Sequence, residues 1–71
     1  MNNSYFQLRQ KRLKLEDIQL QLSKIQSDVL FFSPEYTYAA FEAAILQVNV
    51  LSQIFHELEI QAEKEEEETN V

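Results

Sequence analysis

Apolar residues in the second half of the chain recur with gaps that alternate between three and four positions. Such gaps keep side chains on one face of an α-helix, and their alternation is the heptad pattern of a helix packed against a neighbour. The residues of this row are Phe41, Ala44, Val48, Leu51, Phe55, Leu58 and Ala62. The pattern predicts a helix over about residues 34–64 that contacts another helix along this row.

The same stretch carries apolar residues on other faces. A helix that is apolar around most of its circumference must be buried on more than one side, and one neighbour covers only one stripe. A second apolar row, interrupted by Gln47, consists of Tyr36, Ala40, Ala43, Val50 and Ile54. This row predicts contact with a further chain. We expect no membrane span, because a span needs about 20 mostly apolar residues and five polar residues between positions 42 and 53 interrupt the run.

The first half of the chain has a heptad row of its own, which consists of Leu8, Leu15, Ile18, Leu22, Ile25, Val29 and Phe32. Ser4 and Gln7 fit the capping box that starts many helices, so we predict a first helix over about residues 4–31. Lys11 also occupies a position of this row, and two interpretations stay open. It sets the register of the packing, or its stem lies along the apolar surface at a frayed helix end while its charge stays in water.

Phe31 and Phe32 are followed by Ser33, Pro34 and Glu35. Proline disfavours helical conformation in the residue before it and is favoured at the first position of a helix. Serine is a good N-cap, and glutamate stabilises the positive end of the helix dipole. These residues therefore predict the end of one helix and the start of the next, which makes the chain a hairpin.

We predict an all-α fold, an antiparallel two-helix hairpin similar to a coiled coil, that spans residues 1–62 and completes a bundle with another chain. Opposite charges favour the antiparallel orientation, although each exposed pair contributes only about 0.2–1 kcal/mol. The basic residues that this orientation brings towards Glu57 and Glu59 are Arg9, Lys11, Arg12 and Lys14.

The chain has 71 residues, no cysteine and a formal net charge of −6. A domain this small rarely gains more than about 3–5 kcal/mol from its own core, so a partner chain is expected to supply the rest. The negative charge disfavours nucleic-acid binding, which relies on cations that neutralise phosphates.

Segment 63–71 is predicted to be a frayed or disordered acidic tail that serves solubility; contact with a basic partner or DNA mimicry is the alternative. Residues 1–8 carry no apolar signal segment, which predicts a cytoplasmic protein.

The residue types that catalysis needs are missing or isolated. The absence of cysteine and glycine excludes thiol nucleophiles and glycine-rich phosphate loops. His56 is the only histidine, and the residue three positions before it is Gln53 rather than the glutamate of a di-iron motif. We expect His56 to be a solvated residue at the edge of the helix packing, and we expect no enzymatic activity, cofactor or metal site.

The turn residues Ser33, Pro34, Glu35 and Tyr36 are followed by an alanine-rich apolar helix. In these features, in length and in its two-helix layout, the chain resembles the small hairpin co-chaperones of type III secretion needle subunits. These cytosolic proteins act with a repeat-helix partner to hold the needle subunit unpolymerised. The resemblance implies that the second helix meets the partner through Ala43, Leu46, Val50 and Ile54. Together with the second apolar row, it gives the candidate partner-binding residues Tyr36, Ala40, Ala43, Leu46, Val50 and Ile54.

The predicted function is a non-catalytic protein–protein interaction module, a small hairpin that oligomerises or binds a partner helix, as a secretion chaperone, co-chaperone or adaptor. One alternative is a small RNA- or DNA-binding regulator that acts as a dimer of hairpins. The basic residues available for phosphates are Arg9, Lys11, Arg12, Lys14 and Lys24, which Glu16, Asp17 and Asp28 dilute. Another alternative is an acidic inhibitor of a nucleic-acid-binding protein, which would use the glutamate-rich tail.

Overall fold

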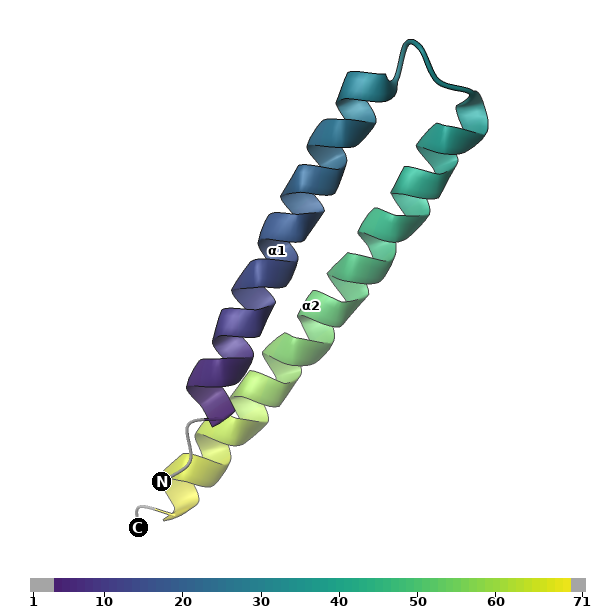
Figure 1. Cartoon of the computed structure of the whole chain (residues 1–71). Coiled ribbons are helices and arrows are strands. Elements are labelled where there is room, and N and C mark those ends of the chain that lie inside the picture. The colour runs from purple at the N-terminus through teal and green to yellow at the C-terminus, as the bar shows by residue number, and fades with distance from the viewer. Residues whose placement is uncertain (1–3, 70–71) are drawn as a thin grey trace.

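The computed structural model describes residues 4–69 of the chain, with side chains described for residues 4–65. This part consists of helix α1, Ser4–Val29, and helix α2, Glu35–Thr69, without a strand between residues 4 and 69. The two helices lie side by side and run in opposite directions, joined by a turn at one end (Figure 1). The molecule measures 58 × 14 × 11 Å. The predicted all-α antiparallel hairpin is confirmed, and its completion into a bundle with another chain stays a prediction.

The turn is closed by contacts at the end of α1. The hydroxyl of Ser33 donates a hydrogen bond of 2.6 Å to the carbonyl of Val29, and the amide of Phe32 donates one of 3.3 Å to the same carbonyl. Both bonds satisfy a carbonyl that the end of a helix leaves without an intrahelical partner. The sequence assigned Ser33 to the start of α2, whereas its hydroxyl serves the end of α1. Pro34 precedes α2, and its carbonyl accepts a 2.9 Å hydrogen bond from the amide of Thr37.

The ends of the helices differ from the predicted ends. Helix α1 stops at Val29, two residues before the predicted end, because the turn contacts begin there. Helix α2 continues to Thr69, five residues beyond the predicted end, so residues 63–69 of the predicted acidic tail belong to this helix. Glutamate and lysine have high intrinsic helix propensity, which favours this extension. Residues 70–71 lie outside the described part of the chain.

The row of residues that faces the opposite helix, here called the seam, contains only half of each predicted heptad row. Every second position is partly or fully buried as predicted; these residues are Leu8, Leu15, Leu22 and Val29 on α1, and Phe41, Val48, Phe55 and Ala62 on α2. Among the alternate positions, Ala44 is partly buried and Phe32, at the turn, is 78% exposed; the remaining four lie outside the seam, since Ile18, Ile25, Leu51 and Leu58 are 40–46% exposed. The residue that follows each of them faces the opposite helix instead; these residues are Gln19, Gln26, Ser52 and Glu59.

Each helix is therefore rotated by about 50° from the predicted orientation, half of the 100° step between neighbouring residues. Polar contacts across the seam account for the rotation. Arg12 forms an ion pair with Glu59, and the side-chain amide of Gln26 donates hydrogen bonds of 3.3 Å to the carbonyl of Tyr38 and 3.1 Å to the carboxylate of Glu42. The predicted orientation would have turned these polar groups away from one another.

The hairpin has no closed hydrophobic core within the part that the structure describes. Among side chains 4–65, Ala62 is the only buried apolar residue, and the other buried residues are Gln26, Ser52 and Glu59. Buried apolar surface is the main source of folding free energy, at roughly 25 cal/mol per Å². Because the other apolar residues of the seam are only partly buried, the two helices gain less free energy from this source than a closed core would give.

Helix α2 passes, by length and composition alone, a test for a membrane-crossing helix over Glu35–Glu65, with a most apolar window of mean hydropathy 1.2. This window includes Asn49 and Ser52, which lie on the side of α2 that faces α1. A helix that crosses the bilayer alone would carry these polar side chains into hydrocarbon at a cost. The expectation that α2 is not a span stays a prediction.

Ser52→Ala is expected to raise the free energy of unfolding by about 1 kcal/mol, because the buried Ser52 hydroxyl has no hydrogen-bond partner. The matched control is Ser27→Ala, at an exposed position of α1. Both changes carry a similar gain in helix propensity, so their difference reports the buried hydroxyl. Urea denaturation followed by circular dichroism at equal chain concentration measures both. Equal shifts would contradict the expectation.

Candidate interaction surface

The seam divides the hairpin into two faces of different character. On one face, polar side chains line a groove of about 450 Å³ between the helices; they are Arg12, Glu16, Gln19, Asn49, Ser52, Gln53, His56 and Glu57. On the other face, a groove of about 500 Å³ has walls of carbon only, formed by Lys11, Lys14, Leu15, Ile18, Leu51 and Phe55. We call these the polar groove and the apolar groove. The two faces differ because each helix is rotated towards its polar contacts.

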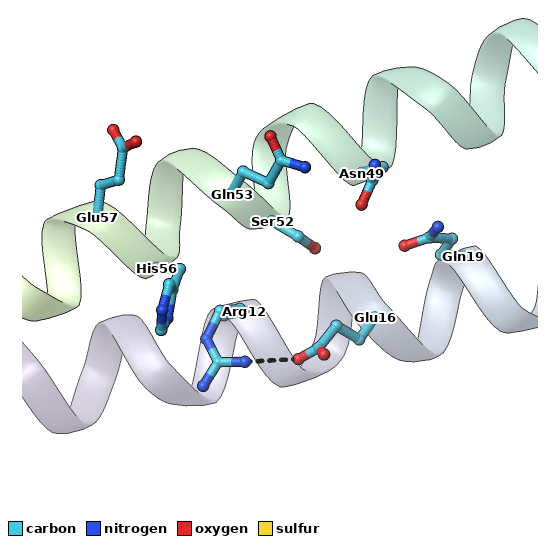
Figure 2. A pocket seen from close by; sticks show the side chains of 8 residues that line it. All are labelled: Arg12, Glu16, Gln19, Asn49, Ser52, Gln53, His56 and Glu57. Carbon is cyan, nitrogen blue, oxygen red and sulfur yellow. Dashed lines mark hydrogen bonds and ion pairs between the residues drawn. The ribbon is translucent and has the colours of Figure 1, made fainter.

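Arg12 is the centre of the polar groove. Its Nε group donates a hydrogen bond to one carboxylate oxygen of Glu59, one terminal nitrogen donates to the other oxygen at 3.3 Å, and the second terminal nitrogen contacts Glu16 at 2.8 Å. Figure 2 shows the contact with Glu16, one turn along α1 from Arg12. The Glu59 side chain is 4% exposed and the Arg12 side chain is 20% exposed. The hydrogen bond to Glu59 is the largest cause that raises the pKa of Arg12 above its ordinary value.

The contacts of Arg12 decide what the polar groove can bind. Two carboxylates already surround the guanidinium, so the groove offers no unpaired cation there to an anionic ligand. His56 is exposed and points towards α1, while Glu57 points away from it (Figure 2). Among the side chains that the structure describes, no group of three histidine or acidic residues could hold a metal ion. The charges of Arg12 and Glu16 are therefore paired within the chain, and the buried Ser52 hydroxyl is a polar atom of this groove without a hydrogen-bond partner.

The apolar groove is the opposite case, because its apolar side chains stay in contact with solvent. Leu51 is 43% exposed and Ile18 is 45% exposed. Lys11 lies outside the seam, exposed at the edge of this groove, and Arg12 takes the seam position that the sequence offered to Lys11. Of the two interpretations of Lys11, the structure agrees with a lysine stem that lies along apolar surface while the charge stays in water.

All six predicted partner-binding residues are exposed in the hairpin. The large ones are Tyr36 (76%), Leu46 (62%), Val50 (43%) and Ile54 (45%), and the small ones are Ala40 and Ala43. At about 100° per residue, all but Leu46 lie on the side of α2 that continues from the apolar groove. Leu46 lies about 140° around the helix from Leu51. Their role in binding stays a prediction.

Sequence reasoning missed four residues of this surface. Ile18, Ile25, Leu51 and Leu58 were assigned to the packing between the two helices, and the structure leaves them half exposed. One signal in the sequence could have found them. Arg12, Gln19 and Gln26 recur every seven residues beside the apolar row of α1, which is the pattern of a second, polar row that can also face a neighbour.

No protein-family model, no curated protein and no solved structure matches the chain. The resemblance to the needle-subunit co-chaperones therefore stays a prediction, and the candidate surface is defined by geometry alone.

Glu59→Gln is expected to lower the free energy of unfolding by about 1.5–3 kcal/mol, because Arg12 loses a charged hydrogen-bond partner. Leucine at both positions, Arg12→Leu with Glu59→Leu, is expected to recover this loss, since apolar residues replace a buried ion pair at little or no cost. Urea denaturation at fixed chain concentration measures these changes. The control Glu57→Gln, at an exposed residue of the same helix, should change stability by less than about 0.5 kcal/mol. A double variant as unstable as Glu59→Gln would contradict this account.

Proposed function

We propose that the chain is a non-catalytic protein–protein interaction module, whose apolar groove and the adjoining side of α2 bind a helix of another chain or of a second copy. One observation supports this most directly: Ala62 is the only buried apolar residue among the described side chains, while sixteen large apolar residues are exposed. Solvent-exposed apolar surface that is contiguous and extensive marks interaction sites in soluble proteins.

The uneven burial of the two grooves supports the same proposal. The hairpin buries Gln26, Ser52 and Glu59 in its seam while Leu51 and Leu58 face solvent. Burying half of a leucine side chain contributes about 1 kcal/mol, so exposing these residues costs the isolated hairpin stability. A partner helix in the apolar groove would recover it, because the groove runs between α1 and α2 as a third helix of a bundle requires.

A role as a secretion co-chaperone or adaptor fits this surface. The resemblance implies contact through Ala43, Leu46, Val50 and Ile54, and all four are exposed; Leu46 alone lies away from the side of α2 that adjoins the apolar groove. Nucleic-acid binding has less support, since Arg12, one of its five candidate cations, pairs with two carboxylates. An enzymatic role has no support from the described side chains. Binding a helix of another chain is therefore the function that this surface supports best.

Ile54→Glu is expected to weaken the association of the chain with its partner by about tenfold or more, because it places a charge in an apolar contact. The control is Gln53→Glu, which adds the same charge one residue earlier, beside the polar groove. Light scattering measures self-association, and quantitative mass spectrometry of tagged chains in host extract measures association with other proteins.

A stable, monomeric wild-type chain at micromolar concentration that binds no hydrophobic dye would contradict the proposed function. If Ile54→Glu and Gln53→Glu weaken association equally, the assignment of the binding surface to the Ile54 side of α2 is contradicted.

A further inference from the structure

We infer that the apolar groove takes a second copy of this chain, placed antiparallel to the first about a two-fold axis, so that two hairpins form a four-helix bundle. In this arrangement α1 packs against α1 of the second copy, and α2 packs against α2. The inference rests on the proposed function, because it names the occupant of the same surface.

The surface along the groove is large enough for a stable dimer. Its half-exposed residues are Ile18, Ile25, Leu51, Ile54 and Leu58, each 40–46% exposed, and at the hairpin tip Phe32 and Tyr36 are 78% and 76% exposed. Together they leave several hundred Å² of apolar surface in water, on the order of the ~800 Å² that each partner buries in a standard interface. A two-fold arrangement uses this one surface on both chains.

Side-chain size along α2 favours the antiparallel orientation. The groove side of α2 carries Ala40 and Ala44 near the turn, and Ile54 and Leu58 near the other end. A two-fold axis that crosses α2 near residue 49 places Ala40 opposite Leu58 of the second copy, and Ala44 opposite Ile54. Small residues then meet large ones at both levels, which keeps the helix axes at an even separation of about 8–10 Å. The same register places Gln47, two residues from the axis, opposite Leu51 of the second copy.

The contacts between α1 and α2 show which residues of α1 lie at each level. Arg12 lies level with Glu59, and Gln26 lies level with Glu42. An axis near residue 49 of α2 therefore crosses α1 near residue 20. Residues equally far from this point on the two copies of α1 come together, as in any antiparallel helix pair.

Charge agrees with this register, which was set by side-chain size alone. Lys11 and Lys14, at the edge of the groove, come to lie opposite Asp28 of the second copy, and all three residues are exposed in the hairpin. A parallel dimer would instead place both lysines level with Phe55 and Leu58 of the second copy, where their charges would lie against apolar side chains. A helix from another protein would need its own acidic residue at this level, and the second copy supplies one.

Light scattering at micromolar concentration tests whether a second copy of the chain occupies the apolar groove. We expect a dimer for the wild-type chain and a monomer for Leu51→Lys, which places a charge in the groove. Leu20→Lys should remain a dimer, because Leu20 is 68% exposed on α1 and does not line the groove. A wild-type monomer overturns the inference.

Exchanging charges between Asp28 and the two lysines tests the register of the dimer. The result does not depend on whether Leu51→Lys folds. Asp28→Lys, and separately Lys11→Glu with Lys14→Glu, should each raise the dissociation constant by about tenfold. The combined triple variant should restore the wild-type value. Within one copy of α1 these residues are about 20–25 Å apart, so only a second copy at this register can couple them. Purely additive losses overturn the antiparallel register.

A spin-label distance tests the orientation independently. The chain has no cysteine, so Phe31→Cys gives one label per chain at the tip, at a side chain that is 93% exposed. The antiparallel dimer should place the two labels about 33 Å apart along the helices, because residue 31 lies about 11 residues from the axis on each copy and the rise is 1.5 Å per residue. A distance of about 20 Å, set by helix separation alone, would show parallel hairpins and overturn the inference.

Failure of the inference and failure of the proposed function give different results. A wild-type monomer that binds hydrophobic dye overturns the inference of a second copy, but it leaves the exposed apolar surface available to another protein. A monomer that binds no dye overturns both.

Discussion

The contact of Arg12 with Glu59 determines which side of each helix faces the other in this hairpin. Bringing the two charges together across the seam requires α1 and α2 to rotate towards the polar groove. The hydrogen bonds of Gln26 at the other end of the hairpin require the same rotation. One consequence follows for the rest of the surface: the residues that would otherwise pack between the helices, Ile18 and Leu51 among them, line an open groove on the opposite face.

This arrangement is hard to explain for a hairpin that acts alone. Half-burial of four aliphatic side chains forgoes about 1 kcal/mol for each of them, while a partly buried ion pair has a net value that is often small. An isolated hairpin would therefore gain by turning its apolar rows inward. The observed rotation becomes favourable when another helix covers Ile18, Ile25, Leu51 and Leu58, because both rows of each helix are then buried, the polar one within the chain and the apolar one between chains.

The sequence was sufficient for the fold but not for the rotation of its helices. Heptad spacing, the Ser33–Glu35 break and the charges around Arg12 predicted two antiparallel helices, since each is a local signal or a sum over many residues. The rotation depends on single contacts: whether Leu51 or Ser52 faces α1 is decided by how Arg12 and Gln26 find partners across the seam. Heptad counting assigns the most apolar row to the nearest helix, which is wrong here because the polar residues of the neighbouring row find partners across the seam.

Ala62 is the one buried apolar residue among the described side chains, and this affects how fast the chain is degraded in a cell. Such a molecule opens at small cost, and proteases degrade proteins in proportion to the population of open forms. In the proposed assembly, copies in excess of their binding sites would therefore be removed quickly, whereas assembled copies would persist. Turnover would then match the amount of the chain to the amount of its complex, without a dedicated regulator.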